Sequence, residues 1–166
     1  MFITMKVHGF TLDSIAQMPI VILKDEGEQY TLPLWISAVE AVSMAAELIG
    51  RDVFSKTGRN DLFSLLLERL EMSVERLLIE SSPAGSNAAM VVFAATDGEL
   101  EVDVRLTDVL VLAIKYGMPI MVSDEVLERG RVDEAAEEKG ITELDARRFI
   151  DFLEKMDPTD MNKYPM

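Results

Sequence analysis

The sequence predicts an α+β fold in which helices pack on a mixed β-sheet built from two hairpin-plus-helix units. One observation is that residues 99–106 alternate strictly between apolar and charged side chains. A period of two residues is typical of a half-buried strand. The second observation is a repeated order of elements, which occurs at residues 19–49 and again at 88–116: a strand, an acidic turn, a strand, a helix cap and a helix. Two such units would share one sheet, with the helices packed on it.

The first half of the chain predicts three strands and a helix. We expect strands at residues 2–12, 19–23 and 30–36, with a turn around Gly27 between the last two. Ser37 and Glu40 have the spacing of a capping box, which predicts a helix that Gly50 ends. Residues 51–60 are expected to form a polar loop.

The second half predicts two more helices and four strands. Asn60 is the expected N-cap of a helix at residues 61–71, whose five leucines predict that it is mostly buried. Strands are expected at 74–80, 88–95, 99–106 and 120–122. Thr107 is the expected N-cap of a buried helix from Asp108 to Tyr116, because this segment is apolar on almost every face. Gly117 should end that helix.

The chain becomes acidic after Ser123, which suggests two parts: a domain at residues 1–128 and an acidic helical tail at 129–166. Thr142 is the expected cap of an amphipathic helix in the tail, with Leu144, Phe149 and Leu153 on its apolar side. This helix either docks on the domain or binds a protein partner.

Composition limits the class of protein. The chain has 166 residues, of which 49% are hydrophobic, so we expect one folded domain with a full core. It has no cysteine, which excludes disulfides and thiolate nucleophiles. No apolar run approaches the ~18 residues of a membrane span, and the first residues lack the order of a signal peptide. We therefore expect a cytoplasmic protein without membrane contact.

The charge balance disfavours a polyanionic partner. Sixteen basic and 30 acidic residues give a net charge of −14, whereas nucleic-acid binders neutralise phosphates with Lys and Arg. The densest positive charge lies in residues 51–60, at Arg51, Lys56 and Arg59. These side chains either lie on a solvated loop or bind the phosphates of a substrate.

Two segments resemble motifs of a known family. The first has a strand and a Leu-Pro-Leu-Trp-Ile segment followed by Glu-Ala, and the second has an Asp and an Arg before an apolar helix that ends in Gly and Pro. The matching residues are Pro19, Ile20, Val21, Leu23, Leu32, Pro33, Leu34, Trp35, Ile36, Glu40 and Ala41, and then Asp103, Arg105, Leu106, Thr107, Asp108, Val109, Gly117, Pro119, Ile120 and Val122. Over residues 5–128 the chain is similar to the bifunctional nuclease family, which implies a mixed α+β fold and cleavage of DNA and RNA.

The chain departs from the family pattern at a residue that bears on catalysis. The family carries Thr-His-Asp at the start of its third helix, and this chain has Arg59, Asn60 and Asp61. The missing histidine removes a general base that titrates near neutral pH. If the family's activity needs that base, this chain should lack the activity.

A nuclease without that histidine would depend on metal. We take Asp103, Arg105 and Asp108 as the catalytic candidates, gathered around one strand-to-helix corner. Carboxylates could hold Mg²⁺ or Mn²⁺, and Arg105 could stabilise developing negative charge. The candidate metal ligands are Asp103, Asp108, Asp61 and Glu40. Helix caps and a surface ion pair explain the same residues without any site.

Two functions therefore remain open from the sequence. One is a metal-assisted phosphodiesterase that acts on nucleic acid. The other is a non-catalytic binding or regulatory module that engages a protein partner, for which the net charge and the acidic tail argue. A homo-oligomer is expected in either case, because a short mixed sheet leaves edges that need cover.

Overall fold

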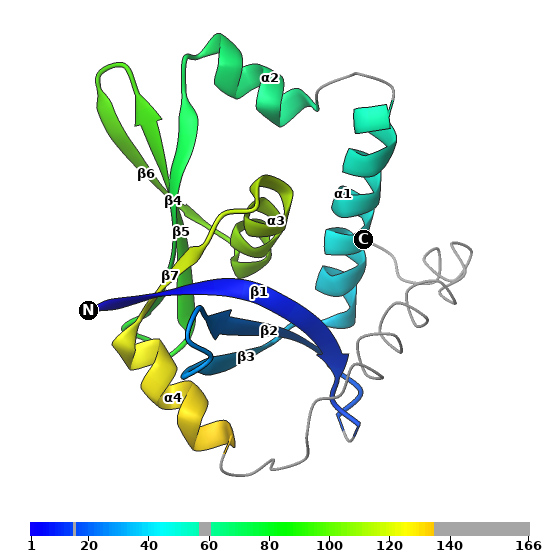
Figure 1. Ribbon diagram of the computed structural model, residues 1–166, viewed down its shortest axis with the longest axis vertical. Helices are drawn as coiled ribbons and strands as arrows, with labels where there is room; N and C mark the ends of the chain where they lie inside the picture. The colour runs from blue at the N-terminus through cyan, green and yellow to red at the C-terminus, as the bar shows by residue number, and fades with distance from the viewer. Residues whose placement is uncertain (15, 57–60, 135–166) are drawn as a thin grey trace.

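The computed structural model describes residues 1–14, 16–56 and 61–134 (Figure 1). Seven strands form one sheet in the order β3-β2-β1-β7-β4-β5-β6. The strands are β1 (Phe2–Leu12), β2 (Pro19–Asp25), β3 (Thr31–Trp35), β4 (Ser73–Ser81), β5 (Asn87–Ala95), β6 (Gly98–Val104) and β7 (Ile120–Ser123). The helices are α1 (Ala38–Lys56), α2 (Leu62–Arg69), α3 (Leu106–Tyr116) and α4 (Asp124–Glu134).

The sheet is mixed and has the predicted internal duplication. The hairpin of β2 and β3 leads into α1 at one edge of the sheet, and the hairpin of β5 and β6 leads into α3 at the other. A further strand, also predicted from the sequence, precedes each hairpin and pairs with its first strand: β1 pairs with β2, and β4 pairs with β5. β7 lies between the two units, antiparallel to β1 and parallel to β4. The predicted α+β architecture is therefore confirmed.

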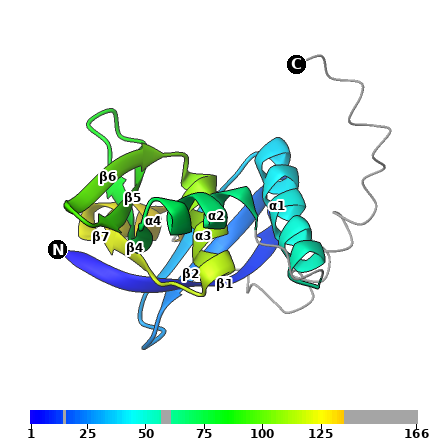
Figure 2. The same ribbon diagram turned by 90° about the horizontal axis from the view of Figure 1, so that it is seen from above.

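One face of the sheet carries the main core. Val21, Leu77 and Val91 from three strands pack with Val109 and Leu110 of α3 in a single buried cluster. α3 lies between the sheet and α1 in both views (Figures 1 and 2). α4 contacts both β3 and β4, although three strands separate them in the sheet order. The sheet must therefore curl, so that its β3 edge approaches the other half of the molecule.

The helix predicted to stop at Gly50 continues to Lys56. The expected polar loop at residues 51–60 is thus wrong for residues 51–56. A single glycine inside a helix costs only about 1 kcal/mol, and no proline follows it, so the helix can pass through. Residues 57–60, with Arg59 and the expected cap Asn60, lie outside the described residues.

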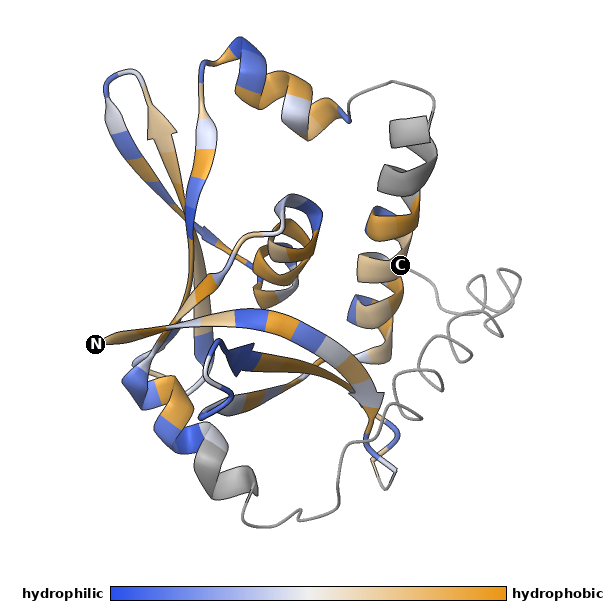
Figure 3. Ribbon diagram, viewed as in Figure 1, coloured by the Kyte–Doolittle hydropathy of each residue, from blue (hydrophilic) through white to orange (hydrophobic). Residues whose placement is uncertain are grey.

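The predicted burial of the third helix is also wrong. No residue of α2 is buried, and the observed N-cap is Asp61. α2 rests on the core only through Phe63 and Leu67, because it lies beyond the start of β4 at the rim of the sheet. The other leucines of this helix and its C-cap are exposed: Leu62, Leu65, Leu66 and Leu70. Figure 3 shows much of α2 in the hydrophobic colour.

α3 begins two residues earlier than predicted. Its N-cap is Arg105, and Thr107 is a buried residue of the first turn. The capping bond comes from Asp108, whose carboxylate accepts the backbone N–H of Arg105. This is the bond from the N-cap N–H to the N3 side chain of a capping box, and it differs from the expected bond from an early helix N–H to the Thr107 hydroxyl. The end of the helix is as predicted, with Gly117 in the left-handed conformation.

α4 contacts β3, β4 and β7. Val126 and Leu127 of this helix belong to the main core, so the predicted boundary between residues 128 and 129 falls inside an element that completes it. The amphipathic helix expected at Thr142 lies outside the described residues. Within residues 1–134 as described, no helix combines the length and apolarity that a membrane crossing requires.

Candidate active site

α1 and α3 begin at the same end of the molecule, and the predicted corner lies there (Figure 1). The Asp108 carboxylate binds the Arg105 guanidinium with both oxygens: Arg105 Nε donates to Oδ2 at 3.0 Å and Nη2 donates to Oδ1 at 2.8 Å. Both side chains are open to solvent, Arg105 at 75% and Asp108 at 38% exposure. Arg105 therefore pairs with Asp108 rather than with Asp103.

Glu40 brings a second carboxylate toward this corner from α1. The predicted capping box is present: the Ser37 N–H donates to Glu40 Oε2 at 2.7 Å, and the Glu40 N–H donates to Ser37 Oγ at 3.2 Å. Hydrogen bonding and charge from Asp108 raise the pKa of the Arg105 guanidinium, and the charges of Glu40 and Glu47 add to this effect. Residues of two helices thus contribute negative charge around one exposed arginine.

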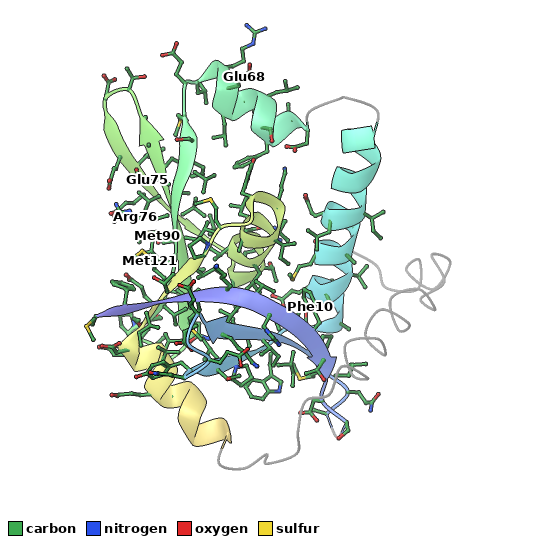
Figure 4. All side chains as sticks on the ribbon, viewed as in Figure 1. Phe10, Glu68, Glu75, Arg76, Met90 and Met121 are labelled. Atoms are coloured by element: carbon green, nitrogen blue, oxygen red, sulfur yellow. The ribbon has the colours of Figure 1, made fainter. Side chains whose placement is uncertain are left out.

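Asp103 lies on the other face of the sheet. Its neighbours Val102 and Val104 pack against the main core, and successive side chains of a strand point to opposite faces. Asp103 is exposed and pairs across the ladder with Met90. Met90 and Met121, which lie close together in Figure 4, both pair with Leu78 across the ladder. Leu78 does not belong to the main core cluster, so this row of residues lies on the face of the sheet opposite the core. The structure therefore separates Asp103 from Arg105 and Asp108.

Asp61 lies at the opposite end of α3 from Asp108. It caps α2 by accepting the Ser64 N–H at 2.9 Å, and Lys115 Nζ lies 2.6 Å from its Oδ2. Burial raises the pKa of Asp61, but hydrogen bonds from Lys115 and Ser64 and the charge of Lys115 outweigh it and lower the pKa to about 2. Lys115 is seven residues, roughly 10 Å, along the helix from Asp108. Asp61 therefore cannot share a metal ion with Asp108.

The remaining predicted ligands and binders are placed only in part. Arg51 and Lys56 belong to α1, but their side chains and Arg59 lie outside the described residues. In the described part of the chain, no group of three or more acidic or histidine side chains is arranged to hold a metal ion. Of the four predicted metal ligands, the structure brings only Glu40 and Asp108 to the neighbourhood of one guanidinium.

A pocket beside the corner was not predicted. Leu106, the first residue of α3, lines it together with residues of β3 and α4. Its polar lining includes Arg129, which the sequence analysis placed only in the acidic segment. The sequence feature that comes closest to indicating this pocket is Pro33, because a proline within a strand indicates that the strand lies at the edge of a sheet.

These features define a class: an α+β domain with a curled mixed sheet and an exposed arginine-carboxylate corner at the start of two helices. The chain belongs to the bifunctional nuclease domain family, whose model matches residues 21–135. Two uncharacterized proteins of Mycobacterium tuberculosis, from strains CDC 1551 / Oshkosh and ATCC 25618 / H37Rv, are similar to it. Each is 27% identical over 160 residues, which cover 93% of this chain and 95% of the relative.

Proposed function

We propose that the protein hydrolyses phosphodiester bonds of nucleic acid at the corner where α1 and α3 begin. The observation that carries this proposal is that Glu40 and Asp108, from two helices, both act on the exposed Arg105 guanidinium. The family's description as a nuclease domain supports the class of reaction. Asn60 stands where the resemblance places the family's histidine, so the proposed chemistry uses no imidazole.

The residues of the corner fit the binding of a phosphate and a divalent cation. Arg105 has the planar fork of donors that binds phosphate oxygens in pairs. Glu40 and Asp108 supply two carboxylates, and Mg²⁺ commonly uses one or two, with water and substrate oxygens as its other ligands. Bound Mg²⁺ or Mn²⁺ would activate water and neutralise charge on the phosphate.

The Arg105–Asp108 pair links these two binding events. Because Asp108 gives both oxygens to Arg105, it blocks the donors that a phosphate would use. A cation bound to the Asp108 carboxylate would displace the Arg105 guanidinium, which is then free for the phosphate, while Asp108 keeps the backbone N–H of Arg105. Cation and substrate should therefore bind cooperatively, each favouring the open pair.

The test compares amide variants, which preserve the shape of both capping groups. Asp108→Asn and Glu40→Gln should each lower Mn²⁺-dependent cleavage of labelled single-stranded DNA and RNA by about 100-fold. Asp103→Asn is the matched control, because its carboxylate projects from the opposite face, and it should keep wild-type activity. Thermal unfolding of each variant shows whether the fold is retained.

Two results would contradict the proposal. One is full cleavage in EDTA. The other is wild-type cleavage by a well-folded Asp108→Asn variant, because the proposed reaction needs the charge of this carboxylate.

The exposed leucines of α2 favour a second candidate function, a non-catalytic module that binds protein. Leu62, Leu66 and Leu70 are 72%, 49% and 61% exposed along one helix. Contiguous exposed apolar surface of this kind marks interaction sites. If this surface forms the expected homo-oligomer, Leu62→Ser with Leu66→Ser should shift sedimentation to the monomer, and Leu100→Ser on β6 should not. A wild-type protein that stays monomeric at all concentrations would show that this surface does not form a homo-oligomer.

The acidic tail needs a separate comparison. A chain that ends at Glu134 keeps α4 and its core residues Val126 and Leu127. If the tail binds a protein partner, the shortened chain should fold normally and lose that partner. Equal binding by both chains would show that the tail is not the partner site.

A further inference from the structure

The pocket beside the corner occupies the gap that the curled sheet leaves open. It has a volume of about 310 Å³ and lies between the edge strand β3, the β4–β5 turn and α4. Its apolar walls include Leu34, Trp35 and Leu106, and its polar lining includes Ser86, Asn87 and Arg129. The volume is at the lower end of the range for small-molecule sites.

The backbone of β3 keeps this gap from being filled by another strand. The Ile36 N–H donates to Pro19 O on the β2 side at 3.0 Å, so alternate residues direct their backbone groups away from β2. Pro33 is one of these residues, and it has no N–H to offer a further strand. On the other side, a Cβ at Gly130 would lie 2.6 Å from Leu32 Cδ1, so α4 packs as closely as a glycine permits. The walls of the pocket are thus fixed by the fold.

Among the described residues that line the pocket, Arg129 is the only one with a positive charge. Its Nη1 donates to the Gly85 carbonyl oxygen, and its Nε donates to the Glu125 carbonyl oxygen at 3.5 Å. Its Nη2 is buried and has no hydrogen-bond partner in the described part of the chain. No ion pair between Arg129 and an acidic side chain occurs within the described residues. Arg129 is half-buried as a whole, but a buried donor atom without a partner is costly, and carboxylates and phosphates are the natural complement of a guanidinium.

We propose that this pocket binds a small organic anion. The apolar body of the ligand would lie against Trp35 and the leucines, and its carboxylate or phosphate group would pair with Arg129. Ser86 and Asn87 offer additional hydrogen-bonding groups at the same end. The proposal does not rest on nuclease activity, since neither Glu40 nor Asp108 lines the pocket.

Trp35 makes the pocket directly observable, because it is the only tryptophan in the chain and lines the pocket. Its fluorescence should change saturably on titration with an apolar anion and not with the matching neutral compound. We would compare AMP with adenosine and octanoate with octanol, and add inorganic phosphate alone. A response to AMP identifies a phosphate ligand, and a response to octanoate identifies a carboxylate ligand. If neither anion gives a saturable change, the proposal is wrong.

Variants separate binding from a merely structural role of Arg129. Arg129→Met should weaken the responding anion by about tenfold or more, because it removes the charged donors. It should leave the midpoint of thermal unfolding unchanged or higher, since it also removes a buried donor without a partner. Arg76→Met, at an exposed arginine paired with Glu99, is the control and should bind as wild type does.

A second substitution covers the case in which Arg129→Met does not fold. Ser86 is exposed at the rim of the pocket, so Ser86→Glu places a carboxylate near Arg129 without disturbing the core. It should weaken the anion by a similar factor, whereas Ser86→Gln should not. Wild-type affinity in Arg129→Met or in Ser86→Glu would overturn the proposal. A lowered unfolding midpoint in Arg129→Met with unchanged binding would assign Arg129 to bridging α4 and the β4–β5 turn.

Discussion

Replacing Asp61 by asparagine should destabilise the protein at neutral pH and have no effect in strong acid. Asp61 connects α2 to α3, because it caps α2 through Ser64 and pairs with Lys115 at the end of α3. Lys115 also lies 5.6 Å from the centroids of the Phe63 and Tyr116 rings. Asparagine caps helices as well as aspartate does, so the substitution removes the charge and keeps the cap.

The expected loss follows from the pKa of Asp61. The folded protein lowers this pKa from 3.8 to about 2, and at about 1.36 kcal/mol per pH unit the ionised form stabilises the fold by about 2 kcal/mol. The Asp61 side chain is 29% exposed, so solvent reduces this value rather than increasing it. A typical domain is stable by roughly 5–15 kcal/mol, which makes the loss easy to measure.

The pH dependence has a definite sign. A carboxylate whose pKa is lower in the folded state stabilises the protein above its unfolded pKa of 3.8, and this contribution disappears as the pH falls toward about 2. Urea unfolding of wild type and Asp61→Asn, followed by circular dichroism, should therefore show a constant gap at neutral pH that closes in this acidic range. Glu99→Gln, in an ion pair whose side chains are 39% and 49% exposed, is the control and should show almost no gap. A gap for Asp61→Asn that is equal at all pH values would refute the electrostatic explanation.

Two glycine substitutions test the backbone and the packing of α4. Gly117→Ala should lower the free energy of unfolding by about 1 kcal/mol, because φ is 62° at this position although no atom lies near the new methyl group. Gly9 also has open space around it but no positive φ, so Gly9→Ala should lower the midpoint of thermal unfolding by less. Equal midpoints for the two variants would contradict this account of strain. Gly130→Ala should destabilise despite a gain of about 1 kcal/mol in helix propensity, because the clash with Leu32 costs ~1–3 kcal/mol. Leu32→Val should partly relieve it, and strictly additive losses in the double variant would exclude the clash.

The elements that could be predicted are those whose signal is local. The hairpins and their strands follow from alternation and turn residues, and the structure confirms the two units at opposite edges of the sheet. Ser37 and Glu40 form the predicted capping box because three residues of spacing are enough to define it. Arg105 was missed as an N-cap because arginine does not cap through its own side chain, and Asp108 does so instead.

The features that could not be predicted depend on segments far apart in the chain. The leucines of α2 are typical of a buried helix, but burial requires a neighbouring surface, and α2 lies at the rim of the sheet. The pocket exists because the curl of the sheet brings β3 near the β4–β5 turn, about fifty residues away in sequence. Neither Pro33 nor Arg129 indicates this proximity by itself. The strict alternation at residues 99–106 did imply that Asp103 and Arg105 share a face, but the strand ends at Val104, and Arg105 turns toward Asp108.

The two carboxylates of the proposed site are also capping groups at the start of α1 and α3, and this double use constrains the experiments. A capping carboxylate is stabilised by the backbone N–H groups it accepts, so it is held in place before any ligand arrives. That preorganisation suits a binding site, but it also means that an alanine at Glu40 or Asp108 loses the start of a helix together with any ligand. Only the amides, which keep an oxygen acceptor and remove the charge, can distinguish the two roles. Loss of cleavage with an unchanged unfolding midpoint would therefore assign the charge to function, whereas parallel losses of both would assign it to the helix.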